Sequence, residues 1–262
     1  MNVISVDKLV KRFGKSRALD GVSFDIKEGT VTGFLGPNGA GKTTAMNILM
    51  GFIMPSSGSA TVLGEPVSPN MAVRRDIGFL SSRMALDKSL TVRQEIDYYA
   101  KLSGVGSKYG LELADDLKLD LKAKIGTLST GNYQKAALIV ALLAQPKLLI
   151  LDEPTNGLDP IIQAEFNKLV KELRAKGTTI FISSHILSEI SGICDRFIFI
   201  RQGKIVAEVT KDELMAKSGE TIAIKSTPDV LKLLKEHKID YKIESADLEK
   251  VFMDYYREGT NV

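Results

Sequence analysis

A glycine-rich stretch, GPNGAGKTT at residues 36–44, places the strongest constraint on how this chain can fold. Its spacing is G-x-x-x-x-G-K-[ST], in which the backbone N–H groups of a loop turn inward around a chain of phosphates. The apolar run TVTGFL at residues 30–35 before it is typical of a buried strand, and apolar residues recur at helical spacing after it. Such a loop opens a helix N-terminus, whose partial positive charge favours an anion. The stretch therefore predicts a site for a nucleoside triphosphate.

Individual roles within this loop follow from the same chemistry. Lys42 is expected to reach the β- and γ-phosphates, and the hydroxyl of Thr43 is expected to bind Mg²⁺. The alternative is a chance match in a glycine-rich turn, and the flanking strand and helix patterns argue against it. The predicted nucleotide-binding residues of the loop are Gly36, Pro37, Asn38, Gly39, Ala40, Gly41, Lys42, Thr43 and Thr44.

A second apolar strand, KLLIL at residues 147–151, is followed directly by two acidic residues. Ligands of open α/β sheets lie at the carboxyl ends of the strands, which is where Asp152 and Glu153 fall. Asp152 is expected to hold Mg²⁺ opposite Thr43, and Glu153 to orient and deprotonate the water that attacks the γ-phosphate. A helix cap is the alternative role for such a pair. The residues that intervene before Pro160 make capping an incomplete explanation.

Strands alternate with helices along most of the chain, which predicts a mixed α/β fold. Nearly all-apolar strands are typical of a parallel sheet with helices on both faces, here a P-loop NTPase core. The first 30 residues predict an added antiparallel β subdomain, and residues of about 83–145 predict a helical subdomain. We expect one nucleotide-binding domain over residues 1–220 and a small α/β extension over residues 221–262.

Composition excludes several other classes of protein. The chain has 262 residues, of which 44% are hydrophobic and 26% charged, as in ordinary soluble globular proteins. A formal net charge of +3 is too small to indicate a nucleic-acid partner. The single cysteine, Cys194, excludes a disulfide framework and fits a reducing compartment.

No segment of the sequence predicts insertion into a membrane or secretion. The longest apolar run, AALIVALLA at residues 136–144, is far shorter than the roughly 20 residues that span a bilayer. The N-terminal residues MNVISVDK lack the pattern of a signal peptide. A cytoplasmic protein is therefore expected, unless a partner tethers it.

The segment LSTGN at residues 128–132 resembles the LSGGQ signature of ABC-type ATPases, and other pieces of that family occur in the right order around it. GPNGAGKTT is similar to the Walker A loop of the family, and LLILDE to its Walker B strand. Phe13 in KRFGK matches the aromatic that stacks on adenine. Asp159 in NGLD belongs to the loop that bridges the two sites of a dimer, and His185 in ISSHIL matches the switch histidine. The resemblance covers roughly residues 1–220.

This resemblance implies a composite site for ATP and Mg²⁺. Ser129 and Gly131 precede a strongly apolar helix, so small residues at its N-terminus form a second anion cradle. In the family, the signature of a second ATPase subunit closes over the phosphates that the Walker loop of the first subunit holds. Two identical subunits or two sister subunits could form that pair. The resemblance also implies that His185 polarises the attacking water.

The run FLSSRM departs from the family pattern. The family has a glutamine within two residues after the strand matching IGFL, and Ser82 takes its place here. A serine hydroxyl can still bind a magnesium-bound water, so Ser82 is included in the predicted metal site, but it is about 2–3 Å shorter in reach. We therefore expect slow hydrolysis, or hydrolysis that waits for a partner. Thr130 and Asn132 in the signature are milder departures.

The tail SADLEKVFMDYY resembles the ending of ATPase subunits from bacterial two-component exporters of drugs and antibiotic peptides. An ordinary amphipathic helix is the alternative interpretation of that tail. The resemblance implies a subunit that powers a separate membrane permease, an exporter, and that sits at the inner face of the cell membrane through it.

Two other functional hypotheses stay open at this point. One is a soluble ABC-type ATPase that acts in a non-transport assembly process. The other is a metabolic kinase or GTPase, which would leave LSTGN and His185 unexplained.

Overall fold

The computed structural model describes residues 1–81, 84–218, 233 and 236. The chain divides into two compact units, Met1–Lys211 and Asp212–Val262, and each is considered by itself. The helix α7 (Lys211–Ser218) begins at this division. The domain boundary expected between residues 220 and 221 stays a prediction.

Two features that the sequence singled out lie outside the described residues. One is Ser82, the predicted metal-site residue, and the other is the exporter-like tail SADLEKVFMDYY. Within the described ranges, no helix is both long enough and apolar enough to cross a lipid bilayer.

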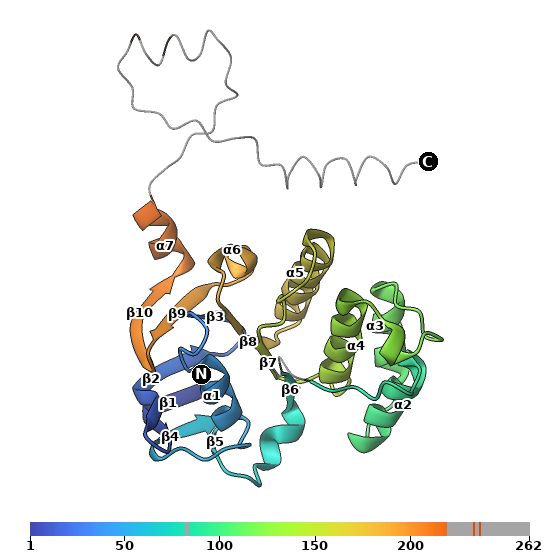
Figure 1. Ribbon diagram of the computed structural model, residues 1–262, viewed down its shortest axis with the longest axis horizontal. Helices are drawn as coiled ribbons and strands as arrows, with labels where there is room; N and C mark the ends of the chain where they lie inside the picture. The colour runs from blue at the N-terminus through green and yellow to red at the C-terminus, as the bar shows by residue number, and fades with distance from the viewer. Residues whose placement is uncertain (82–83, 219–232, 234–235, 237–262) are drawn as a thin grey trace. The chain divides into compact units, whose positions relative to one another are not determined.

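The first unit is built around a mostly parallel sheet with the strand order β10-β9-β3-β8-β7-β6 (Figure 1). The strands from β9 to β6 run parallel, and β10 pairs with β9 in the antiparallel direction. Every residue of β3, β7 and β8 is buried, which explains their nearly all-apolar sequences. The strand bounds are β3 Val31–Leu35, β6 Ile77–Leu80, β7 Leu148–Asp152, β8 Thr179–Ser184, β9 Arg196–Arg201 and β10 Lys204–Thr210.

A separate antiparallel sheet is formed by the early part of the chain, as predicted, with the strand order β2-β1-β4-β5. Its strands are β1 (Asn2–Phe13), β2 (Ser16–Lys27), β4 (Ser57–Val62) and β5 (Glu65–Pro66). Buried residues of the two sheets share one core. Phe24 of β2 packs against Phe34 of β3 and Phe181 of β8, with ring centroids 5.6 and 5.8 Å away.

Three helices of the segment predicted to be helical lie together beyond the edge strand β6 (Figure 1). They are α2 (Val92–Leu102), α3 (Lys108–Asp116) and α4 (Thr130–Leu142). The side chain of Thr91 caps α2 in a capping box with Gln94, which satisfies backbone N–H groups that a helix start leaves free. Short 3₁₀ turns cover residues 72–76 and 125–127.

The remaining helices of the first unit connect the strands of the parallel sheet. They are α1 (Lys42–Leu49), α5 (Pro160–Ala175) and α6 (Leu187–Ile190). Apolar residues recur at helical spacing over residues 186–194, but α6 ends at Ile190. The chain turns after Ile190 because Ser191 and Gly192 are weak helix formers and β9 must begin at Arg196.

Candidate active site

The glycine-rich loop leaves the end of β3 and runs into the N-terminus of α1. Gly41 is the N-cap of α1, with a φ of 112°, and no side chain caps this helix start. The first N–H groups of a helix have no partner within the helix, so here they are available to an anion. The loop therefore has the geometry that its sequence predicts.

Two glycines of the loop are required by close approach of other backbone segments. A Cβ at Gly36 would lie 2.2 Å from the carbonyl oxygen of Ile200, and a Cβ at Gly41 would lie 2.6 Å from that of Ala18. Both distances are well inside van der Waals contact. The loop is thus held between β2 and β9, and no residue with a side chain fits at either position.

Lys42 is almost fully buried, with 4% of its surface exposed. Its ammonium group donates to the carbonyl oxygen of Gly36 at 2.6 Å and to that of Pro37 at 3.2 Å. It also lies 3.1 Å from the Oε1 atom of Glu153. A cation is therefore fixed between the glycine-rich loop and the acidic end of β7.

Asp152 ends β7 and accepts hydrogen bonds at both carboxylate oxygens. The Thr43 hydroxyl donates to Oδ2 at 2.8 Å, and the Ser183 hydroxyl donates to Oδ1 at 2.8 Å. Asp152 has no exposed surface. The hydrogen bond from Ser183 is buried, and the one from Thr43 is partly buried. The structure thus brings together the two predicted metal-site residues that it describes. Ser183 is a further site residue that the sequence reasoning missed.

Glu153 has a left-handed backbone conformation, with a φ of 50°, which is rare for a residue that has a side chain. Because of this conformation, the chain turns away from the direction of β7 directly after Asp152. The Glu153 N–H group donates to the Ser183 hydroxyl at 2.9 Å. Its Oε2 atom lies 3.3 Å from Nδ1 of His185, at the end of β8, while Oε1 faces Lys42. The three predicted catalytic residues, Lys42, Glu153 and His185, therefore form one cluster.

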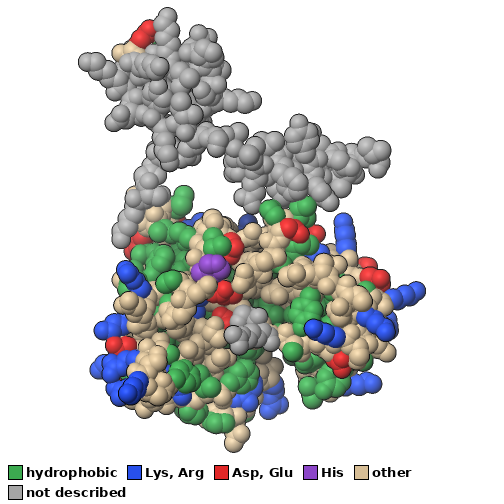
Figure 2. Space-filling view, viewed as in Figure 1, with side chains coloured by type: hydrophobic (Ala, Val, Ile, Leu, Met, Phe, Trp, Pro, Cys, Tyr) green, Lys and Arg blue, Asp and Glu red, His purple; other side chains and the backbone are tan. Residues whose placement is uncertain are grey.

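This cluster opens to the molecular surface on one face. Figure 2 shows acidic side chains on the face in view, between the surrounding elements. About a third of the His185 side chain is exposed, against 14% of that of Glu153. The histidine therefore stands between the buried carboxylate and solvent.

The signature segment has the predicted place at a helix start. Ser129 is the N-cap of α4, and its hydroxyl accepts the N–H group of Asn132 at 3.3 Å. Gly131 lies in the first turn, where a Cβ would come 3.1 Å from the side chain of Ile162 on α5. The small residue thus permits α4 to approach α5. The role of Ser129 and Gly131 in binding phosphate stays a prediction.

Asp159 has a local structural role. Its carboxylate caps α5 by accepting the N–H groups of Ile161 and Ile162 at 3.0 and 2.9 Å. Pro160 follows at the first helical position, as the sequence predicts. A role of Asp159 at the nucleotide stays a prediction.

Phe13 ends β1 with about half of its side chain exposed, at 51%. The ammonium group of Lys11 lies 5.1 Å from its ring centroid. An exposed ring with a cation on it is suited to stacking on a planar base. That stacking role stays a prediction.

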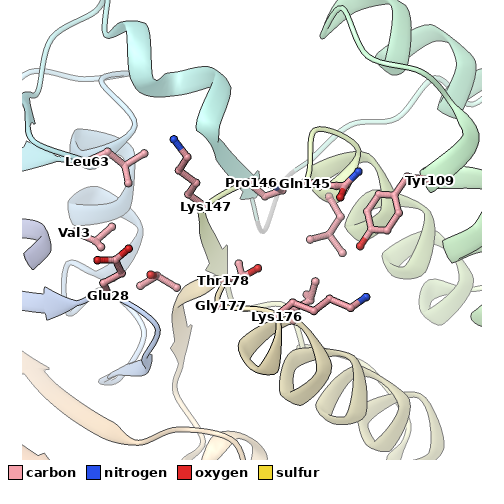
Figure 3. A pocket seen from close by; sticks show the side chains of 13 residues that line it. Val3, Glu28, Leu63, Tyr109, Gln145, Pro146, Lys147, Lys176, Gly177 and Thr178 are labelled. Carbon is pink, nitrogen blue, oxygen red and sulfur yellow. The ribbon is translucent and has the colours of Figure 1, made fainter. Parts of the chain in front are cut away.

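A cavity of about 310 Å³ lies elsewhere in this unit (Figure 3). Its lining includes Lys147 and Thr178, which precede β7 and β8, and Tyr109 of α3. The cavity therefore lies at the amino-terminal edge of the parallel sheet, whereas Asp152 and His185 lie at the carboxyl edge. It is not part of the cluster described above.

Fold and site together define a class of protein. A phosphate loop joins β3 to a helix, and the carboxyl ends of β7 and β8 supply two carboxylates and a histidine next to it. This is the architecture of a P-loop nucleoside triphosphatase. A model of the ABC transporter family matches residues 19–156, and the chain belongs to that family as an ATP-binding, ATP-hydrolysing subunit.

Relatives support the same assignment along nearly the whole chain. The bacitracin transport ATP-binding protein BcrA of Bacillus licheniformis is 34% identical over 98% of this chain and 87% of its own length. The daunorubicin resistance ATP-binding protein DrrA3 of Streptomyces coeruleorubidus is 38% identical over 82% of this chain and 71% of its own.

Solved structures of ATP-binding cassettes have folds similar to that of this chain. One is the dimeric post-hydrolysis state of the ATP-binding cassette MJ0796 bound to ADP and Pi. It has a TM-score of 0.73 and 25% identity, covering 79% of this chain and 98% of that one. A nucleotide-free ATP-binding cassette from an ABC transporter has a TM-score of 0.73 and 25% identity, covering 89% of this chain and 98% of that one.

Proposed function

We propose that this chain works as a dimer that closes around ATP and powers a separate membrane permease that exports a drug or antibiotic. The observation that carries the proposal is the cluster in which the Glu153 carboxylate lies between Lys42 and His185 at the end of the parallel sheet. The names of relatives such as the bacitracin transport protein and the daunorubicin resistance protein support the export of such compounds.

The described residues divide the work of hydrolysis between them. Lys42, at the start of α1, holds the β- and γ-phosphates together with the N–H groups of the loop. Glu153 accepts a proton from the attacking water, and its second oxygen is oriented by His185. His185, partly exposed above the carboxylate, holds that water toward the γ-phosphate.

The donor set at Thr43 and Asp152 fits Mg²⁺. A hydroxyl and a carboxylate oxygen 2.8 Å apart are hard oxygen ligands, and Mg²⁺ in such sites takes one or two protein oxygens together with substrate phosphates. When bound, the ion would neutralise charge on the phosphates during transfer. Thr43 and Asp152 would hold it, and Ser82 is proposed as an additional contact through water.

The second half of each site comes from the partner subunit in this proposal. Ser129 and Gly131 at the start of α4 would close over the phosphates that the partner's loop holds, and Asp159 would lie in the bridging loop between the two sites. Phe13 would stack on adenine. The similar cassette that is dimeric and bound to ADP and Pi supports the dimer on which this arrangement depends.

The permease places the protein at the inner face of the cell membrane in this proposal. The formal net charge of +3 gives no reason to propose a nucleic-acid partner. The alternative is an ABC-type ATPase without a permease, acting in an assembly process. The two proposals predict different partners, so partner capture separates them.

Affinity capture of tagged protein from detergent-solubilised host membranes, followed by mass spectrometry, tests the proposal. A polytopic membrane protein recovered in stoichiometric amount is the expected result. Capture is repeated with Glu153→Gln and ATP, which should hold the dimer closed. If both preparations contain soluble partners alone, the permease proposal is wrong and the assembly process takes its place.

A further inference from the structure

We infer that Gln134 is a positioning residue that links the signature at one ATP site to the catalytic carboxylate of the other site. The inference rests on the proposed composite dimer, in which each α4 faces the ATP held by the partner's loop. It adds a route by which one chain connects the two sites.

The link is a hydrogen bond from α4 to the turn after β7. The side-chain amide of Gln134 donates from Nε2 to the carbonyl oxygen of Pro154 at 2.9 Å. Pro154 directly follows Glu153 and is buried. A side chain of the signature helix therefore contacts the backbone next to the catalytic carboxylate.

Gln134 lies one helical turn after the predicted phosphate contact. Gly131 and Gln134 are three residues apart on α4, so they lie on the same side of the helix. Gly131 faces Ile162 of α5, and Gln134 faces the turn that leads toward α5. A displacement of the start of α4 by a bound phosphate would thus act on Pro154 directly.

The conformation of Glu153 makes its position sensitive to such a displacement. Its φ of 50° is strained for a non-glycine residue, and neighbouring contacts must maintain it. On one side Ser183 of β8 accepts the Glu153 N–H group at 2.9 Å. On the other side Gln134 holds the following carbonyl group. Ser183 belongs to the parallel sheet and Gln134 to α4, so Gln134 is a hydrogen-bonded contact through which a movement of α4 reaches the turn.

The neighbouring residue Lys135 offers a matched control on the same helix. Its ammonium group lies 2.6 Å from Oε2 of Glu165 on α5 and donates to the carbonyl oxygen of Leu117 at 3.0 Å. These contacts fasten α4 to the end of α3 and to α5, away from the Pro154 carbonyl. Replacing Lys135 should therefore loosen α4 without removing the specific link.

Mixed dimers with two affinity tags separate the two roles that Gln134 could have. One subunit carries Glu153→Gln, so that hydrolysis occurs only at the loop of the other, active subunit. Gln134→Glu, which replaces the donor by a carboxylate of the same shape, is then placed in either subunit. In the active subunit it cuts the link beside the working Glu153. In the inactive subunit it alters the signature helix that faces the hydrolysed ATP.

The proposed link predicts a loss of kcat of about tenfold only when Gln134→Glu is in the active subunit, the factor expected for one lost hydrogen bond. The KM for ATP should stay within about twofold in both arrangements, because the loop and Phe13 are untouched. Gln134→Lys, which keeps a donor of similar reach, should restore most of the rate. Lys135→Met should lower Tm and affect both arrangements alike.

Other outcomes overturn the inference. A loss confined to the dimer with Gln134→Glu in the inactive subunit would mean that Gln134 only supports the signature. Equal losses, or no loss in either arrangement, would show that no link passes through it. If the dimer that carries Glu153→Gln alone has no activity, or does not form with ATP, the proposed composite site itself fails, and that result is distinct from the others.

Discussion

Thr43 and Asp152 stand 109 positions apart in the sequence, and the hydroxyl of the first donates to the carboxylate of the second at 2.8 Å. The first residue is in the opening turn of α1, and the second ends β7. This hydrogen bond joins the phosphate loop to the acidic edge of the sheet. Ser183 and Glu153 extend the same contact network to β8, so substitutions within it should affect stability and hydrolysis together.

Ser183→Ala should lower both the stability of the protein and its rate of ATP hydrolysis. The change removes the donor to Oδ1 of Asp152 and the acceptor for the Glu153 N–H group, and it leaves buried polar atoms without these partners. We expect a loss of about 1–3 kcal/mol in the free energy of unfolding and a fall in kcat. Chemical denaturation measures the free energy of unfolding, and a steady-state ATPase assay measures kcat. Ser191→Ala, at a partly buried serine outside this network, is the control, and an unchanged kcat in Ser183→Ala would contradict the prediction.

Glu153→Gln should abolish turnover while ATP still binds. The amide keeps the size of the side chain but cannot accept the proton of the attacking water, so kcat should fall by about 10²–10⁴. Phosphate release measures turnover, and size-exclusion chromatography with ATP measures the dimer. Glu28→Gln on the surface controls for the loss of one charge. Turnover within about threefold of the original protein would remove Glu153 from its assigned role.

Gly41→Ala should prevent the glycine-rich loop from closing correctly. Its φ is 112°, and the added Cβ would lie 2.6 Å from the carbonyl oxygen of Ala18, so the loop must shift. Gly177→Ala is a matched control, because Gly177 also has a positive φ, of 92°, but no atom lies within 4 Å of the added Cβ. The control should cost about 1 kcal/mol, with normal ATP affinity. Isothermal titration calorimetry measures the ATP affinity of Gly41→Ala and of the control. Equal affinities in the two variants would refute the steric argument.

Phe13→Ala should weaken ATP binding with little effect on folding. The ring is half exposed, so few core contacts are lost. Loss of stacking on the base should cost about 1–3 kcal/mol, which raises the Kd by about 5-fold to 150-fold. Tyr98→Ala, at a similarly exposed aromatic of α2, is the control. If both variants bind ATP like the original protein, the adenine does not stack on Phe13.

Glu95→Gln should stabilise the protein at neutral pH and not in acid. Burial raises the pKa of the Glu95 carboxyl in the folded state, although its hydrogen bond from the Asp87 N–H group opposes the shift. Between the unfolded and the folded pKa, the folded state therefore holds a proton that the unfolded state has released, and stability falls as the pH rises through this window. The isosteric amide removes this loss, so Tm of the variant should exceed that of the original protein near neutral pH.

Thermal melts of the original protein and Glu95→Gln across pH 4 to 8 measure this difference. The advantage of the variant should shrink toward the acid end, where the carboxyl is protonated in both states. Glu112→Gln, at an exposed position of α3, is the control for loss of one charge. A constant difference at all pH values would mean that the effect does not arise from titration.

The parts of the site that the sequence alone predicted depend on short-range patterns. The loop GPNGAGKTT carries its own turn chemistry, and the apolar runs before Asp152 and His185 show that both residues end buried strands. The carboxyl ends of parallel strands lie at one edge of a sheet, so the sequence alone predicted that Asp152 and His185 would lie near each other. The alternation of strands and helices likewise predicted the fold, and the structure confirms it.

Other features required the tertiary structure, because they depend on how distant segments align. Ser183 becomes a partner of Asp152 only through the register of β7 against β8, which no local pattern specifies. Gln134 contacts Pro154 only because α4 packs beside the turn after β7. The sequence by itself predicted which residues would carry phosphate and proton chemistry, because their motifs are local. The packing of strands and helices decided which neighbours hold those residues in place, since that depends on contacts between segments far apart in the chain.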